Sequence, residues 1–117
     1  MSIKRIKVTP RMSQAVVHGN IVYTAGQVAL KAAGEDAGEQ TKDVLNSIDS
    51  LLEEAGTDKT KILTTNIWLA DMADFGAMNE VWDAWVSPDN APTRACVESR
   101  LAAPQFTVEI AVTAAID

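Results

Sequence analysis

Two segments of the chain have apolar residues at helical spacing, and they alternate with segments that have apolar residues at strand spacing. Of all the features of the sequence, this order of segments restricts the possible folds most strongly. The first helical segment has apolar side chains every three or four residues. These are Val44, Leu45, Ile48, Leu51, Leu52 and Ala55. Gly56 follows them as a C-terminal cap, so the sequence predicts a helix of about five turns.

The second helical segment carries larger apolar side chains on one stripe. They are Phe75, Met78, Val81, Trp82 and Trp85. Asp71 or Asp74 can cap its start, and Pro88 predicts that the helix has ended before it.

Strand spacing occurs before, between and after these helices. The predicted strands are residues 3–8, 15–18, 21–25, 62–69, 93–98 and 107–116. Gly19 and Asn20 separate two of them, which predicts a tight hairpin of the II′ kind. Residues 31–38 are polar and show no periodic pattern, so we expect a mobile, irregular stretch there.

The predicted order is β-ββ-α-β-α-ββ, which we interpret as a single two-layer α+β domain over residues 1–117. Helices on one side leave the other face of the sheet uncovered. In the last strand that face carries small or weakly polar side chains such as Thr107, Ala111 and Thr113. Association of subunits through the sheet is therefore expected.

Composition excludes several classes of protein. One Cys and one His cannot supply an internal disulfide or a structural zinc site, so we expect no metal. No apolar run reaches the about 18 residues of a membrane helix, and the start lacks a signal peptide. We therefore expect no membrane association and a cytoplasmic location.

Charge is distributed unevenly along the chain. The net charge is −6, and residues 1–34 hold five of the 10 bases and none of the 16 acids. The five bases are spread out and are not interleaved with aromatic residues, so nucleic-acid binding is disfavoured.

Arg94 is the most unusual residue of the chain, because it follows a Pro-bounded turn and lies in an otherwise apolar strand. An unpaired buried charge is costly, so the guanidinium needs a partner. One hypothesis is an ion pair within or between subunits. The other is an anchor for a ligand carboxylate, which a guanidinium binds through two parallel hydrogen bonds.

Three further residues have side chains of the types that take part in catalysis. Cys96 lies two residues after Arg94 and shares its side of the strand, either as a nucleophile or as a small buried thiol. Glu109 on the last strand is either a solvated or ion-paired carboxylate, or a group that orients a water. His18, the single histidine, precedes the hairpin turn and is interpreted as structural or solvent-facing.

Several stretches together carry a family resemblance. Residues 19–27 (GNIVYTAGQ), 91–98 (APTRACVE) and 108–110 (VEI) resemble the reactive intermediate deaminase (RidA, YjgF-type) family. Residues 69–86 are similar to its YoaB-like branch. The resemblance covers nearly the whole chain in order and with matching spacing, and the combination of these pieces is specific.

The resemblance implies a chorismate-mutase-like α+β fold and a homotrimer with clefts between subunits. It also implies hydrolysis of 2-imino or enamine acids, such as 2-aminoacrylate, to 2-keto acids and ammonia without a cofactor. By position, Arg94 would hold the substrate carboxylate and Glu109 would orient the attacking water. Gly26 would provide backbone contacts, and Cys96 would line the pocket without forming a covalent bond.

Two positions remain open within this resemblance. Met12 stands where many members carry an aromatic residue, often Tyr. The resemblance implies that this position lines the substrate site, and a ring hydroxyl is then missing there. Asn79 matches a frequent helix position, and the sequence assigns it no role. The competing function is a non-catalytic trimer in which Arg94 binds a keto or fatty acid for sensing or regulation.

Overall fold

The computed structural model describes residues 2–117 and contains one mixed sheet. The strands are β1 (Ile3–Val8), β2 (Ser13–His18), β3 (Ile21–Thr24), β4 (Gln27–Val28), β5 (Ile62–Leu69), β6 (Thr93–Glu98) and β7 (Val108–Ala115). Their order across the sheet is β1-β2-β3-β7-β5-β6, and β4 also pairs with β7. All neighbours are antiparallel except β5 and β6. β1 and β6 are therefore the two edges.

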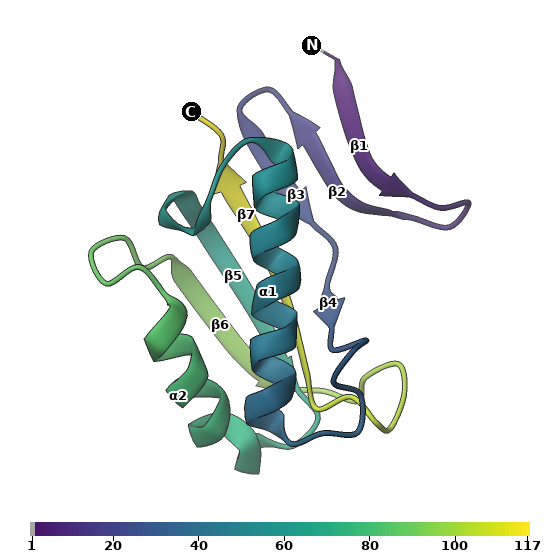
Figure 1. Ribbon diagram of the computed structural model, residues 1–117, viewed down its shortest axis with the longest axis vertical. Coiled ribbons are helices and arrows are strands. Elements are labelled where there is room, and N and C mark those ends of the chain that lie inside the picture. The colour runs from purple at the N-terminus through teal and green to yellow at the C-terminus, as the bar shows by residue number, and fades with distance from the viewer. Residues whose placement is uncertain (1) are drawn as a thin grey trace.

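Two helices cover one face of this sheet (Figure 1). They are α1 (Ala37–Ala55) and α2 (Phe75–Trp85), which lie side by side in the helix layer. Short 3₁₀ turns precede β5 (η1, Lys59–Lys61) and α2 (η2, Met72–Asp74). The predicted two-layer α+β architecture is confirmed, and β4 is an additional short strand that the sequence did not indicate.

The hairpin between β2 and β3 has the predicted turn. His18 pairs with Ile21 across Gly19 and Asn20. Gly19 has φ 63°, and among residues 2–117 the single non-glycine residue with positive φ is Lys7. A positive φ at the first central position alone is the property of a II′ turn.

Helix α1 begins earlier than its apolar stripe indicated, so the expectation of irregular structure through Gly38 was wrong for its last two residues. Asp36 is the N-cap, and its Oδ1 accepts a hydrogen bond from the backbone N–H of Glu39 at 2.9 Å. At the other end Gly56 has φ 91° and closes the helix in the left-handed conformation, as predicted.

The start of α2 uses both predicted aspartates, but in different ways. The Asp71 side chain accepts from the backbone N–H of Ala73 and so caps η2. Asp74 occupies the N-cap position of α2 without a side-chain hydrogen bond to the backbone. The chain thus turns into α2 through one 3₁₀ turn.

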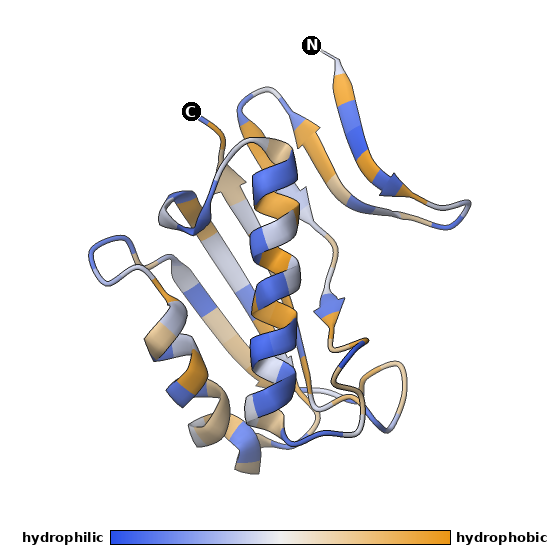
Figure 2. Cartoon of the chain, in the orientation of Figure 1, coloured by the Kyte–Doolittle hydropathy of each residue, from blue (hydrophilic) through white to orange (hydrophobic). Residues whose placement is uncertain are grey.

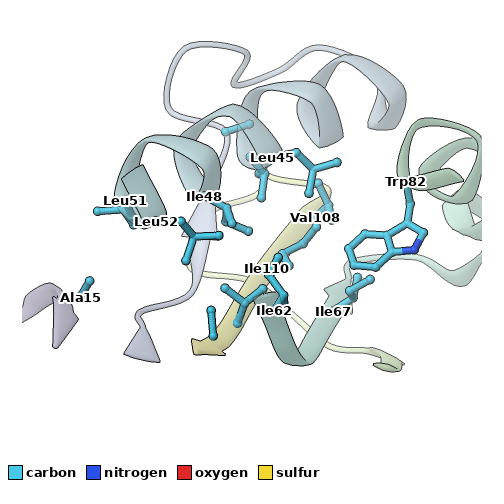
Figure 3. Packing of buried hydrophobic residues seen from close by; sticks show 14 of the residues in the cluster. Ala15, Leu45, Ile48, Leu51, Leu52, Ile62, Ile67, Trp82, Val108 and Ile110 are labelled. Carbon is cyan, nitrogen blue, oxygen red and sulfur yellow. The ribbon is translucent and has the colours of Figure 1, made fainter. Parts of the chain in front are cut away.

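The core lies between the helix layer and the sheet. In β7, Val108, Ile110, Val112 and Ala114 are buried and face α1, while the residues between them are half-buried on the opposite face. Figure 3 shows side chains from α1 pointing onto this strand, and Trp82 pointing from α2 toward Ile67 of β5. Figure 2 shows orange apolar positions alternating with blue polar ones along α1, as a half-buried helix requires.

The sheet face opposite the helices is largely uncovered. Tyr23 and Val97 lie on it, with 47% and 51% of their surface exposed. Trp68 and Ala111 are half-buried there, and the hydroxyl oxygens of Thr64 and Thr113 are hydrogen-bonded at 2.6 Å. We call this side of the sheet, opposite the helices, the free face of the sheet. It is apolar enough to favour contact with another protein surface.

Candidate functional site

Arg94 lies on the edge strand β6 and points to the helix side of the sheet. In the parallel pair of β5 and β6 it is opposite Thr65, which is 2% exposed in the core. Cys96 is opposite Ile67, which is 1% exposed, so Arg94 and Cys96 share this side as predicted. The Arg94 side chain is itself exposed.

Helix α2 holds the Arg94 guanidinium through three side chains on one of its faces. The Arg94 Nη1 donates a hydrogen bond to Asn79 Oδ1 at 2.7 Å. The guanidinium carbon lies 5.4 Å from the centre of the Trp82 ring and 5.8 Å from that of Phe75. Cation–π contacts at these distances are attractive. Among residues 2–117 the single ion pair is that of Lys42 with Glu39, so Arg94 has no carboxylate partner within the subunit.

This geometry orients a cation while leaving most of its donors free. A guanidinium has five N–H groups, and Asn79 uses one of them. An amide oxygen fixes the position of Arg94 without neutralising its charge, as a carboxylate would. The remaining fork can bind a carboxylate through two parallel hydrogen bonds.

Cys96 is half-buried beside this group and packs against the core. Burial raises the pKa of the Cys96 thiol, and the neighbouring Arg94 charge opposes that shift only in part. The thiol is therefore protonated at neutral pH. A pocket-lining role fits this environment better than a nucleophilic one.

Glu109 and Gly26 meet on the free face of the sheet, not on the Arg94 side. Glu109 lies between the buried residues Val108 and Ile110 of β7 and points away from the helices. A Cβ added at Gly26 would lie 2.8 Å from Glu109 Cδ and would overlap its Oε2 atom. Gly26 is therefore required to let the carboxylate lie against the backbone. Burial raises the pKa of Glu109.

Met12 lies in the loop between β1 and β2, near the sheet edge opposite to β6 (Figure 1). Its backbone N–H donates to Thr9 Oγ1 at 3.1 Å, and its side chain is 42% exposed. His18 ends β2 and is exposed. Neither residue belongs to the group around Arg94 in the same subunit.

The five predicted site residues thus form three separate groups within one subunit. Arg94 and Cys96 face the helices, Gly26 and Glu109 face the opposite side, and Met12 lies on the β1–β2 loop. The sequence missed the parts that Phe75, Asn79 and Trp82 have in holding Arg94. Their spacing of four and three residues, one face of a helix, was the available signal.

Residues 2–117 contain no group of three or more His, Cys, Asp or Glu side chains placed to hold a metal ion. Within the same residues, neither helix has the length and apolarity that a bilayer crossing requires.

Comparison with known proteins gives consistent matches along the whole chain. A family model described as endoribonuclease L-PSP matches residues 2–116. A RutC family protein of Haemophilus ducreyi is 49% identical over 115 residues, covering 98% of this chain and 97% of the relative. The RutC family protein YoaB of Escherichia coli K12 is 43% identical over 116 residues, covering 99% and 100%.

The fold gives the same result. The crystal structure of a YjgF family member from Neisseria meningitidis matches with a TM-score of 0.96 at 45% identity, covering 100% of this chain and 97% of that one. The chain therefore belongs to the YjgF/RidA family, within its YoaB-like branch. Its two-layer α+β fold is the fold of that family.

Proposed function

We propose that this protein hydrolyses 2-imino and enamine acids, of the 2-aminoacrylate type, to 2-keto acids and ammonia. The observation that carries the proposal is the Arg94 guanidinium, which Asn79 orients at 2.7 Å and which has no carboxylate partner among residues 2–117. An arginine held in this way is suited to bind the carboxylate that every such substrate has. We place the reaction in the cytoplasm and require no cofactor for it.

The proposed active site lies between subunits of a homotrimer. Arg94 and Glu109 lie on opposite sides of one sheet, so both can reach one substrate only if they come from different subunits. The exposed Tyr23 and Val97 support association through the free face of the sheet. Light scattering tests this assembly, because a monomer at micromolar concentration would leave Arg94 and Glu109 apart.

The chemistry needs little more than placement and one proton-handling group. The C2 carbon of a protonated imine is already electrophilic, so a positioned water can attack it. Glu109 accepts a proton as the new C–O bond forms, giving a carbinolamine. Return of that proton to nitrogen makes ammonia the leaving group. As the C–N bond breaks, Glu109 takes the hydroxyl proton, so the C2 oxygen becomes the keto oxygen, and this proton then leaves with ammonia as ammonium. Arg94 remains bound to the carboxylate throughout.

An oxidase-coupled assay tests turnover. An amino acid oxidase generates the 2-imino acid in the presence of semicarbazide, which traps it. Active protein diverts the imine to the keto acid, so the semicarbazone signal decreases with protein concentration. An unchanged signal at micromolar protein, for both alanine-derived and leucine-derived imines, would contradict the proposal.

A non-catalytic carboxylate-binding trimer is the second candidate. It is favoured by the separation of Arg94 from Glu109 within a subunit, because Arg94 alone can bind a keto or fatty acid without activating water. Binding of pyruvate that depends on Arg94, with no imine turnover, would support this function. The family description names an endoribonuclease, but a net charge of −6 opposes RNA as the substrate.

A further inference from the structure

A groove of about 770 Å³ runs between α1 and α2, on the outer side of the helix layer. Leu45 from α1 and Val81 from α2 line it, together with the small side chains of Ala77 and Ala84. It lies on a different face of α2 from Phe75, Asn79 and Trp82, which hold Arg94. It is therefore distinct from the candidate active site. Association through the free face of the sheet leaves this groove open to solvent.

Trp85 forms a fixed aromatic wall of the groove. Its Nε1 donates a hydrogen bond to Asp49 Oδ2 at 3.0 Å, and its ring packs 5.4 Å from that of Trp82. The Lys59 ammonium lies 5.2 Å from the centre of the Trp85 ring. A tryptophan held in one orientation at a half-exposed position is the kind of side chain that dominates binding energy at protein interfaces.

The rim of the groove carries an excess of uncompensated negative charge. Asp36, Asp74 and Glu80 line it and form no ion pair with any of residues 2–117. The two cations of the rim are already engaged, because Lys42 pairs with Glu39 at 3.2 Å and Lys59 lies over Trp85. Lysine or arginine on an incoming surface would complement these carboxylates.

The shape of the groove favours a helix as its occupant. It lies between two helices, and α2 is 11 residues long, which corresponds to about 16 Å. A third helix of three to four turns could place one apolar stripe between them. Alanine at positions 77 and 84 leaves room for the leucine-sized side chains of such a stripe.

We propose that the groove between α1 and α2 binds an amphipathic helix of a partner protein, with Lys or Arg beside its apolar stripe. The stripe packs on Val81 and Trp85, over the exposed small side chains of Ala77 and Ala84. The basic residues face Asp36, Asp74 and Glu80. This is an interaction surface on the outside of the protein, independent of the reaction at Arg94.

Three fluorescein-labelled peptides of about 18 residues test the proposal by anisotropy at 150 mM salt. The first has leucines at helical spacing with lysines elsewhere. The second has the same composition with the leucines scattered round the helix, and the third has glutamates in place of lysines. We expect the first to bind at least about tenfold more tightly than the other two, because it alone combines the stripe with the matching charge. If the second peptide bound as tightly as the first, general attraction of a basic peptide to an acidic protein would explain the binding. That result would overturn the proposal.

Matched variants locate the binding. Glu80→Lys reverses a charge on the rim, and Glu54→Lys makes the same change on the exposed surface of α1 outside the groove. Reversing one exposed charge near the peptide should weaken binding about fivefold, and the control should change it little. Equal effects of the two variants would contradict the assignment.

The indole N–H signals in a ¹H–¹⁵N spectrum give an independent measurement on the unmodified surface. The three tryptophans, Trp68, Trp82 and Trp85, are assigned by single Phe substitutions. The Leu/Lys peptide should shift the Trp85 signal and leave that of Trp68, on the free face of the sheet, unchanged. A shift confined to Trp68 would place the peptide on the sheet and overturn the proposal.

Discussion

The Arg94 guanidinium is held to helix α2 by the side-chain amide of Asn79, at 2.7 Å from Nη1 to Oδ1. Asn79 thereby joins an edge strand to a helix and fixes the direction in which Arg94 offers its free N–H groups. The acceptor is neutral, so the positive charge of Arg94 is preserved for a ligand.

Asn79→Ala should raise KM for imino acids and the Kd for pyruvate, while kcat changes less. A hydrogen bond to a charged group contributes about 1.5–3 kcal/mol, so a loss of about tenfold or more in carboxylate affinity is expected. Asn46→Ala, at an exposed position of α1, is the control. Equal affinities in the two variants would mean that Asn79 does not position Arg94.

Arg94→Ala should abolish turnover, and Arg94→Lys should largely do so. An ammonium cannot reproduce the two parallel hydrogen bonds of a guanidinium. Arg94 is exposed in the single subunit, but the proposed intersubunit cleft desolvates its pair with the substrate carboxylate. Removing one partner of such a desolvated pair costs about 2–5 kcal/mol, which is about thirtyfold or more in kcat/KM. The semicarbazide assay measures the change. Normal turnover in the Ala variant, with unchanged pyruvate binding, would assign Arg94 to structure alone.

Gly26→Ala should remove most activity because the new methyl group occupies the place of the Glu109 carboxylate. Misplacing a reacting group by about 1 Å can cost on the order of 100-fold in rate. Gly76 in α2 offers a matched control, since a Cβ there meets nothing within 4 Å. Gly76→Ala should keep activity and raise the free energy of unfolding by about 0.5–1 kcal/mol, because alanine is the better helix former. Full activity in Gly26→Ala would separate Glu109 from the reaction.

The pH dependence of activity should report Glu109. Burial raises its pKa above the ordinary glutamate value, and the proposed reaction needs the deprotonated form. Turnover should therefore fall as the pH is lowered through this raised pKa, at a higher pH than for an exposed glutamate. Glu109→Gln should lower kcat and remove that acidic decrease, with pyruvate affinity nearly intact. Equal loss of pyruvate affinity in this variant would indicate a role in binding or folding.

The same shift has a consequence for stability. A carboxyl group whose pKa is higher in the folded than in the unfolded state binds more protons when folded, so it favours folding at low pH. That contribution is lost as the pH rises from the unfolded pKa through the folded one. At neutral pH the desolvated charge of Glu109 opposes folding. Thermal unfolding at pH 7 should therefore show Glu109→Gln to be at least as stable as the original protein.

Most of the fold could be predicted because its signals are local. The apolar stripe before Gly56, the Gly19–Asn20 turn and the alternation in β7 each depend on residues close in sequence. Two features of the fold were not predicted. The short strand β4 has too few residues for a pattern, and the start of α1 depends on a single side chain, Asp36.

The candidate site could be predicted only as a set of residues. The type of each side chain indicated its chemistry, and the two-residue spacing of Arg94 and Cys96 placed them on one side of a strand. Whether Glu109 faces the same side depends on the register of β5 with both β6 and β7. In that register Trp68 pairs with Glu109, which lies more than 40 residues further along the chain. A pattern of neighbouring residues cannot predict a pairing over such a distance.

The placement of Arg94 and Glu109 on opposite sides of the sheet allows a test by genetic complementation. In a ring of three subunits where each site takes Arg94 from one subunit and Glu109 from the next, any mixture of Arg94→Ala and Glu109→Gln subunits regains one intact site. Random mixing of the two inactive variants should then restore about a quarter of the original activity. Two inactive proteins would thus become active on co-expression, and a cell carrying both alleles would retain activity that neither allele alone provides.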